Sequence, residues 1–244
     1  MSERQPHLAL EVDGNGAHPA AGPAFDVATL RSRVTAAEAA GFALVTIADS
    51  PLPPPRGAIE AGVRAAYLSR LTRRIGLAPT LHATVTEPFH LATQLASLDH
   101  ASLGRGGWVV GADHDAAAFA TVGLPRLDGP ELRRELTDVI DVARLLWDSW
   151  EDDAVIKDLA TGRFLDADRV HHVDFTGERF SVIGPLITPR PPQGQLVVLG
   201  ADTLGVTDRL DVALIAAPSF DEVADRARQA REAGAPWSSP TWRC

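Results

Sequence analysis

The chain has 244 residues, a length that fits one α/β domain built around a single core. Its 23 basic and 32 acidic residues leave a formal net charge of −9, which disfavours nucleic acid and anionic membranes as partners. No apolar run approaches the roughly 18 residues that a membrane span requires, and the first residues lack the apolar stretch of a secretory signal. The one cysteine, Cys244, excludes an intramolecular disulfide. We therefore expect a soluble, cytoplasmic protein.

The N-terminal half alternates short apolar runs with helical patterns, which is typical of βα units around a parallel sheet. Strands are expected at residues 8–12, 43–48, 75–81 and 106–111. Helices are expected from Asp26, a good N-cap, to Gly41, and over residues 58–71 and 87–100. Loops rich in glycine and proline separate these elements at residues 13–23 and 51–55.

A longer helix and an interruption follow. Residues 131–147 carry an apolar stripe at helical spacing, made by Leu132, Leu136, Val139, Ile140, Ala143 and Leu146. Residues 148–168 are acidic and polar, residues 170–183 predict a hairpin that turns at Thr176 and Gly177, and four prolines at 185–192 form a stiff connector. Because residues 148–195 are too few to bury a core, we expect an insertion within one domain of residues 1–244.

The βα alternation then returns. A strand is expected at 196–199, a turn at 200–205, a strand at 212–216 and a helix at 220–233. The tail at 236–244 has two tryptophans and two prolines and predicts a loose end or one that packs on a partner. This gives six parallel strands, whereas a closed barrel has eight. We therefore expect a TIM-barrel-like but incomplete α/β barrel, whose open edges another element or subunit covers.

Candidate site residues follow three of the strands, because parallel α/β folds place their chemistry at the carboxyl ends of strands. Asp49 follows the second strand, where it contacts a ligand or caps the loop. His82, Ala83 and Thr84 follow the third strand and are expected to line the mouth of the barrel. Gly200, Ala201 and Asp202 lie between a strand and an expected helix start, where backbone N–H groups favour an anion. Asp202 is itself an anion, so a role as helix cap competes with phosphate binding there.

No metal site is expected. His171 and His172 are adjacent in a predicted strand and therefore point to opposite faces, so they cannot hold one ion together.

Three stretches resemble the bacterial-luciferase-like flavin monooxygenases, in the branch with nitrilotriacetate and dibenzothiophene-sulfone monooxygenases. They are TEPFHLA with LASLDH at 86–92 and 95–100, LWDSWEDDA at 146–154, and GPL with PRPPQG at 184–186 and 189–194. Their order and spacing match that branch, and the similarity runs from about residue 8 to 233.

The resemblance implies a barrel that binds reduced FMN, reacts it with oxygen and oxygenates a small organic substrate, with the reduced flavin supplied by a separate reductase. Carried over by position, Asp49 matches an acidic residue that contacts the flavin. Thr84, or Ala83 in another register, matches a Ser/Thr stretch after the third strand. Gly200, Ala201 and Asp202 match the loop that holds the FMN phosphate.

Other positions depart from the family. Residues 109–112 read VVGA where the family has Asn-x-Val-Thr-Ser, and the usual His and Tyr fall near Gly129 and Arg133. The serine that would hold the phosphate aligns with Asp202, and two like charges about 4 Å apart repel by about 1 to 4 kcal/mol. The last two βα units of the barrel are also expected to be missing.

Two functions therefore remain open from the sequence. The first is an oxidoreductase that binds FMN or a deazaflavin. The second is a catalytically silent relative without cofactor, acting as a partner subunit or a small-molecule binding module. In both cases a homo- or hetero-oligomer is expected. The position of the Asp202 carboxylate discriminates between them, because a carboxylate that occupies the anion site excludes phosphate.

Overall fold

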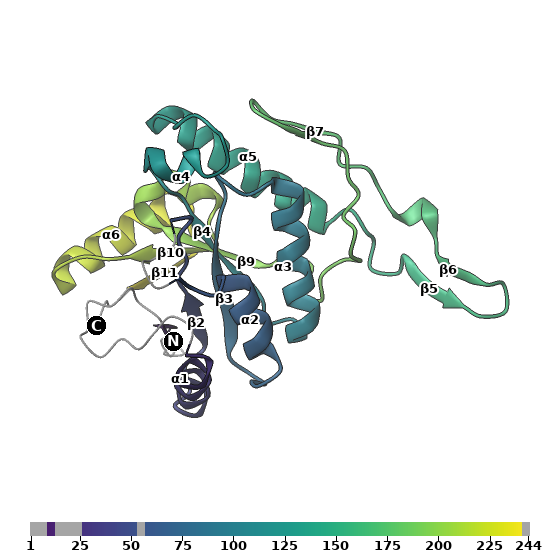
Figure 1. The fold of residues 1–244 in the computed structure, drawn as a ribbon, viewed down its shortest axis with the longest axis horizontal. Coiled ribbons are helices and arrows are strands. Elements are labelled where there is room, and N and C mark those ends of the chain that lie inside the picture. Colours follow the sequence, from purple (N-terminus) through teal and green to yellow (C-terminus); the bar gives the residue numbers. More distant parts are fainter. Residues whose placement is uncertain (1–8, 13–25, 53–56, 241–244) are drawn as a thin grey trace.

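Seven parallel strands form one curved sheet in the computed structural model, which describes residues 9–12, 26–52 and 57–240. The strand order is β1-β2-β3-β4-β9-β10-β11, and neighbours pair in parallel throughout (Figure 1). The strands are β1 (Ala9–Glu11), β2 (Leu44–Ile47), β3 (Gly76–His82), β4 (Gly107–Gly111), β9 (Val197–Ala201), β10 (Val212–Ile215) and β11 (Trp237–Pro240). In the described part of the chain no ladder joins β1 to β11, so the barrel is nearly closed but has an open seam.

Helices connect the strands and begin at residues whose side chains accept hydrogen bonds from the first backbone N–H groups. They are α1 (Val27–Ala39), α2 (Ala61–Ser69), α3 (Pro88–Ser102), α4 (Ala116–Ala120), α5 (Gly129–Trp147) and α6 (Phe220–Glu232). At α5, Asp128 and Glu131 form a reciprocal capping box, which satisfies donors that the first helical turn leaves unpaired. The expected helices are all present, and α4 is an addition. No helix in the described ranges is both long and apolar enough to cross a bilayer.

The six expected strands are confirmed within the described residues. The tail at 236–244 was expected to be loose or to pack on a partner; for residues 237–240 the expectation of a loose end was wrong, and residues 241–244 lie outside the described part of the chain. Residues 237–240 form β11, which pairs with β10 in register from Val212 opposite Trp237 to Ile215 opposite Pro240. The Trp-Ser-Ser-Pro sequence of this strand has no alternation of apolar and polar residues, and its proline suggests a loop. Tertiary pairing with β10 overrides these weak local preferences.

Residues 148–195 lie outside the barrel sheet. The expected hairpin is present as β7 (Phe175–Thr176) and β8 (Ser181–Val182), and it packs along α5, where Glu178 N donates to Asp138 Oδ2 at 3.0 Å. A second hairpin, β5 (Val155–Asp158) with β6 (Arg163–Leu165), was not predicted in the acidic stretch. Figure 1 shows β5 and β6 projecting away from the barrel, with a short 3₁₀ helix (Ala167–Arg169) after them.

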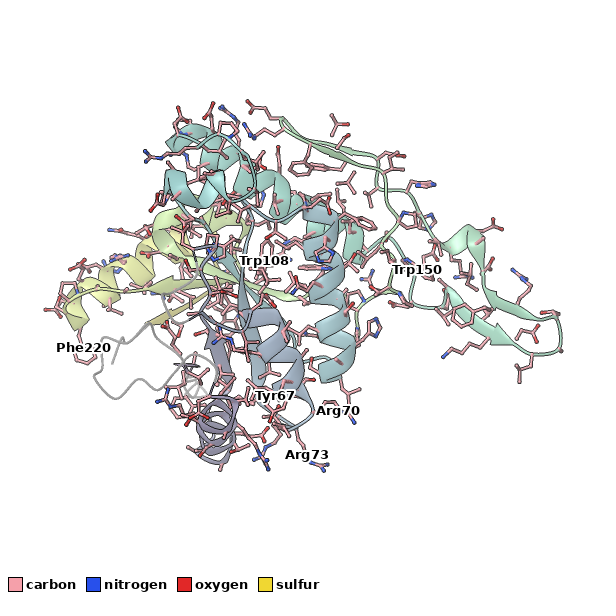
Figure 2. The ribbon with its side chains drawn as sticks, viewed as in Figure 1. Tyr67, Arg70, Arg73, Trp108, Trp150 and Phe220 are labelled. Atoms are coloured by element: carbon pink, nitrogen blue, oxygen red, sulfur yellow. The ribbon has the colours of Figure 1, made fainter. Side chains whose placement is uncertain are left out.

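The core lies mainly between the sheet and the helices. Leu77 is buried with residues of α1 and α2, whereas Leu81 and Trp108 are buried with residues of α3 and α5. Figure 2 shows Trp108 in the middle of the body, and its indole N–H donates to Leu81 O at 3.0 Å. Because side chains alternate along a strand, His82 on β3 and its cross-strand partner Gly111 on β4 face the inside of the barrel.

Parts of the stretches that carry the family resemblance, around Asp99 and Gln193, meet at the amino end of the strands. Asp99 is fully buried, and its carboxylate accepts hydrogen bonds from Gly106 N at 3.0 Å and from Gln193 N and Nε2 at 3.0 and 2.6 Å. Arg190 contacts Asp148 and Asp152 at 2.5 and 3.0 Å. Contacts at this end of a barrel stabilise the fold, so the parts of these stretches around Asp99, Arg190 and Gln193 belong to the scaffold.

Candidate active site

Asp49 follows β2, and its carboxylate is occupied by the backbone of the loop and helix that come next. Oδ1 accepts a hydrogen bond from Ser50 N at 2.8 Å, and Oδ2 accepts one from Ala61 N, the first residue of α2, at 2.6 Å. Of the two roles expected for Asp49, capping therefore accounts for both oxygens. A contact of this residue with flavin stays a prediction.

The His82 side chain lies across the inner mouth of the barrel. Its Nε2 is 3.2 Å from the carbonyl oxygen of Asp49, which follows the neighbouring strand on one side. On the other side the ring lies over Gly111, where an added Cβ would be 2.7 Å from His82 Nδ1. The Nδ1 atom is buried and has no hydrogen-bond partner in the structure.

Ala83 and Thr84 follow His82 and are both buried, but their side chains have different surroundings. Ala83 packs in the core cluster between the sheet and the helices, and its N–H donates to Gly111 O at 3.0 Å. Thr84 is 3% exposed, and its Oγ1 has no hydrogen-bond partner. A buried hydroxyl without a partner is rare in folded proteins and calls for an explanation. Of the two residues expected from the sequence, Thr84 is the one whose side chain carries a polar atom.

The Asp202 carboxylate neither extends into solvent nor caps a helix. Its Oδ2 and Oδ1 accept hydrogen bonds from Arg226 Nε and Nη2 at 2.8 and 2.6 Å, and only 12% of the Asp202 side chain is exposed. The same guanidinium donates through Nη1 to Ala216 O, just beyond β10, at 2.7 Å. This bidentate pair joins α6 to the carboxyl ends of β9 and β10 and offsets the negative charge that the sequence places there. The expected role of Asp202 as a helix cap was therefore wrong.

The loop after β9 also differs from the expected strand-to-helix turn. Gly200 and Ala201 belong to β9 itself, and two short 3₁₀ helices follow, Asp202–Leu204 and Thr207–Arg209. A single turn of three residues provides little of the dipole that a long helix would aim at an anion. Gly205 adopts a φ of +76°, and a Cβ added there would be 2.5 Å from Arg133 Cδ, so the Arg133 side chain of α5 lies directly against this loop.

The structure thus gathers the expected site residues at the carboxyl ends of β2, β3 and β9. The sequence analysis did not single out Gly111, whose missing side chain admits the His82 ring, or Arg226, which pairs with Asp202. The VVGA stretch was a visible signal, because it departs from the Asn-x-Val-Thr-Ser pattern of the family. Arg226 lies 24 residues from Asp202 on another element, and no local pattern connects the two residues.

The two histidines considered for a metal have separate partners. His171 Nε2 is 2.8 Å from Glu151 Oε1, whereas His172 Nδ1 is 2.9 Å from Gly184 O. Among residues 9–12, 26–52 and 57–240, no group of three or more His, Cys, Asp or Glu side chains has the arrangement of a metal site.

The parallel strands and the helices that connect them place the chain in the α/β-barrel class, with the candidate residues at the carboxyl ends of the strands. The model of the luciferase-like monooxygenases matches residues 8–239, and the chain belongs to this family.

Three known proteins illustrate the similarity. N-acetyl-S-(2-succino)cysteine monooxygenase of Bacillus subtilis (strain 168) is 42% identical over 139 residues, which cover 57% of this chain and 32% of the relative. One of the subunits of pristinamycin IIA synthase of Streptomyces pristinaespiralis is 38% identical over 177 residues, which cover 72% of this chain and 58% of the relative. A solved riboflavin lyase with modified FMN and riboflavin superimposes with a TM-score of 0.86 at 24% identity, over 98% of this chain and 62% of that one, and shares its fold. The chain spans less than two thirds of each of these proteins.

Proposed function

We propose that the chain binds FMN at the carboxyl ends of its strands and acts as a flavin-dependent monooxygenase on a small organic substrate. Membership of the luciferase-like monooxygenase family supports this proposal, as does the relative named as a monooxygenase at 42% identity. The structural neighbour that carries a modified FMN has the same fold.

The observation that carries the proposal is the buried Thr84 hydroxyl without a partner. Leaving such a group unsatisfied costs about 1–3 kcal/mol, which a ligand recovers when it supplies a hydrogen-bonding atom. The family resemblance matches Thr84, or Ala83 in another register, to the Ser/Thr stretch after the third strand, and the unpartnered hydroxyl belongs to the first of these two residues. We propose that the ring of the flavin lies near this position.

At the phosphate end, the pair of Asp202 and Arg226 removes the main objection to FMN. A lone carboxylate would repel a phosphate dianion by about 1–4 kcal/mol at 4 Å, but Arg226 makes this position close to neutral. Arg133, beside Gly205, adds a positive charge next to the same loop. Gly200, Ala201 and Asp202 would lie at the phosphate, with the Asp202–Arg226 pair adding no net charge and Arg133 providing the attraction.

The chain's own contribution is to bind, orient and shield the cofactor. Reduced FMN, when bound, supplies the electrons that activate oxygen. In this proposal Thr84 orients the ring, and Asp49 joins the end of β2 to the first residue of α2. No side chain is assigned as nucleophile or base. We also propose that the substrate is a small organic molecule, that a separate reductase delivers the reduced flavin and that the protein is cytoplasmic.

Equilibrium titration with FMN, oxidised and photoreduced under anaerobic conditions, tests this function. We expect micromolar or tighter binding, a loss of about tenfold in Thr84→Val, and retention in Thr84→Ser, which keeps the hydroxyl. A parallel titration with a deazaflavin decides between the two cofactors. The absence of flavin binding at several hundred micromolar would contradict the proposal.

A second function, a non-catalytic partner subunit, is favoured by one observation. In the described residues the outer edges of β1 and β11 have no strand partner, and proteins normally cover such edges. One relative is itself named as a subunit of a synthase. Sedimentation of the purified chain tests this alternative: a stable oligomer without flavin affinity supports it, and a flavin-binding monomer counts against it.

A further inference from the structure

The Arg133 side chain of α5 packs across the loop that follows β9. Its Cδ and Cγ lie 2.5 and 3.1 Å from the place that a Cβ of Gly205 would occupy, so the arginine fills space that residue 205 leaves open. Its Nη1 lies 3.8 Å from the place of a Gly129 Cβ, so the guanidinium points back toward the first residue of α5, as long side chains on helices do. The charged group therefore lies between this loop and the beginning of the helix.

The Arg133 guanidinium is both accessible and unpaired. The residue is exposed, and in the part of the chain that the structure describes its guanidinium makes no hydrogen bond and no ion pair. Two other arginines, Arg134 in the next position of α5 and Arg226 at the same loop, are paired with Glu178 and Asp202. No carboxylate partner offsets the charge of Arg133, and an anion from solution can reach it.

The backbone groups that commonly bind a phosphate are already in use here. Helix N-termini bind anions through N–H groups that no helical carbonyl accepts. At α5 the capping box of Asp128 and Glu131 satisfies such donors, and neither carboxylate pairs with Arg133. The two 3₁₀ helices after β9 are three residues long each and provide little dipole. Of these groups, the Arg133 side chain is the one that remains for an anion.

We infer that Arg133 binds the terminal phosphate of the cofactor and makes the site selective for a phosphorylated flavin over the same flavin without its phosphate. This inference rests on the proposed function, because it concerns the same cofactor site. A guanidinium donates two parallel, charge-assisted hydrogen bonds to a phosphate, which a neutral terminal hydroxyl does not equal in strength. Because the Asp202–Arg226 pair is close to neutral, the preference depends on Arg133, and Gly205 is the residue that positions it.

A comparison of FMN with riboflavin isolates the phosphate, because the two molecules share the ring and the ribityl chain. Both are titrated against the unmodified chain, Arg133→Gln and Arg133→Lys. We expect the unmodified chain to prefer FMN by about tenfold or more, and this preference to fall to about twofold in Arg133→Gln. Arg133→Lys keeps the charge but not the paired donors, so it should retain part of the preference. Riboflavin affinity should change by less than about twofold in either variant.

Three further variants are controls or test the role of Gly205. Arg126→Gln removes the same charge from the loop before α5, where Arg126 is also exposed, and should keep the preference because salt screens a charge that does not contact the phosphate. Gly205→Ala places a Cβ against the Arg133 side chain and should reduce the preference. Gly123→Ala should not, because Gly123 has the same left-handed backbone but nothing lies within 4 Å of its added Cβ. Denaturation midpoints establish that all variants fold.

The salt dependence of binding is a separate readout that needs no turnover. Raising KCl from about 0.05 to about 0.5 M should weaken FMN binding to the unmodified chain, because salt screens an exposed ion pair. This dependence should be largely lost in Arg133→Gln and absent for riboflavin. Inorganic phosphate should compete with FMN but not with riboflavin.

The outcomes distinguish the inference from the function on which it rests. If neither flavin binds to the unmodified chain, the proposed function fails and the inference fails with it. If FMN binds but riboflavin binds equally well, or if Arg133→Gln weakens both to the same extent, the inference alone is overturned. An equal loss of preference in Arg126→Gln also overturns it, because the effect would then be one of general charge. A preference that Gly205→Ala leaves unchanged refutes the role given to Gly205.

Discussion

Replacing Gly111 by alanine tests how tightly the mouth of the barrel holds His82. The new Cβ would be 2.7 Å from Nδ1, whereas ordinary contacts begin near 3.4 Å, so the ring must move by at least about 0.7 Å. Because Cγ, at the root of the ring, is also only 2.9 Å away, the whole side chain must rotate, and the contact with Asp49 O is lost. Overpacking costs about 1–3 kcal/mol and the lost hydrogen bond about 1 kcal/mol, so we expect about 2–4 kcal/mol in the free energy of unfolding.

Urea denaturation of four variants measures this cost and its origin. In a His82→Ala background the ring is absent, so Gly111→Ala should then cost less than about 1 kcal/mol. Gly107→Ala, on the same face of β4, is the control, because its added Cβ meets Ala78 Cβ at 3.3 Å and needs only a small adjustment. An equal cost of Gly111→Ala with and without the His82 ring would refute the reasoning.

Three further predictions concern charged side chains. Arg226→Ala leaves the Asp202 carboxylate, 12% exposed, without its partner, and we expect a loss of about 2 kcal/mol in stability that Asp202→Asn partly restores. The Glu38 carboxylate accepts hydrogen bonds from the backbone N–H groups of residues 73–75. Burial raises the pKa of Glu38, but these hydrogen bonds together outweigh burial, so the pKa lies below the ordinary value of 4.5. Its contribution is therefore present above pH 4.5 and lost as the pH falls through the folded-state pKa, and Glu38→Gln should flatten acid denaturation there. At Glu135 burial raises the pKa more than Arg179 lowers it. The contribution of Glu135 to stability is therefore full below pH 4.5 and is lost as the pH rises through the folded-state pKa. Glu135→Gln should remove this loss.

Each of these predictions has its own check. Thermal or urea unfolding of the Asp202 and Arg226 single and double variants gives their coupling energy, and strictly additive losses would contradict a paired role. Stability measured from pH 3 to 7 separates the two glutamates, because their contributions change in opposite directions. An unchanged pH profile in Glu38→Gln, or a steeper decline toward neutral pH in Glu135→Gln, would show that the assigned carboxylate is not responsible.

Much of the barrel follows from local patterns in the sequence. The stripe from Leu132 to Leu146 predicts α5 because it repeats at helical spacing, and all of its members are buried in the main core cluster. The strand at 237–240 could not be found in this way, because its side chains carry no strand pattern and pairing with β10 alone defines it.

The positions of the candidate residues at strand ends were predicted, whereas their tertiary partners were not. Asp49, Thr84 and Asp202 lie at or just beyond strand ends as expected, because the end of an apolar run in the sequence predicts where a strand ends. Their partners do not follow from chain order: Asp202 pairs with Arg226 on α6, and Asp49 bonds to the first residue of α2. The stretches around Asp99 and Gln193 that identify the family lie at the opposite end of the barrel, so the resemblance was more informative about the fold than about the chemistry.

The 148–195 segment leaves and rejoins the barrel at points that are fastened to each other. Leu186 N donates to Ser149 Oγ at 3.0 Å, and Gln193 bonds to Asp99 just before the chain enters β9. Between closed ends, a doubling of loop length costs only about 0.6 kcal/mol. The turn between β5 and β6, where Leu159 is 97% exposed, is therefore a permissive position for grafting a peptide or a reporter domain. A natural change in the length of this segment should also cost little folding free energy, so its length and sequence can change while the register between β4 and β9 stays the same.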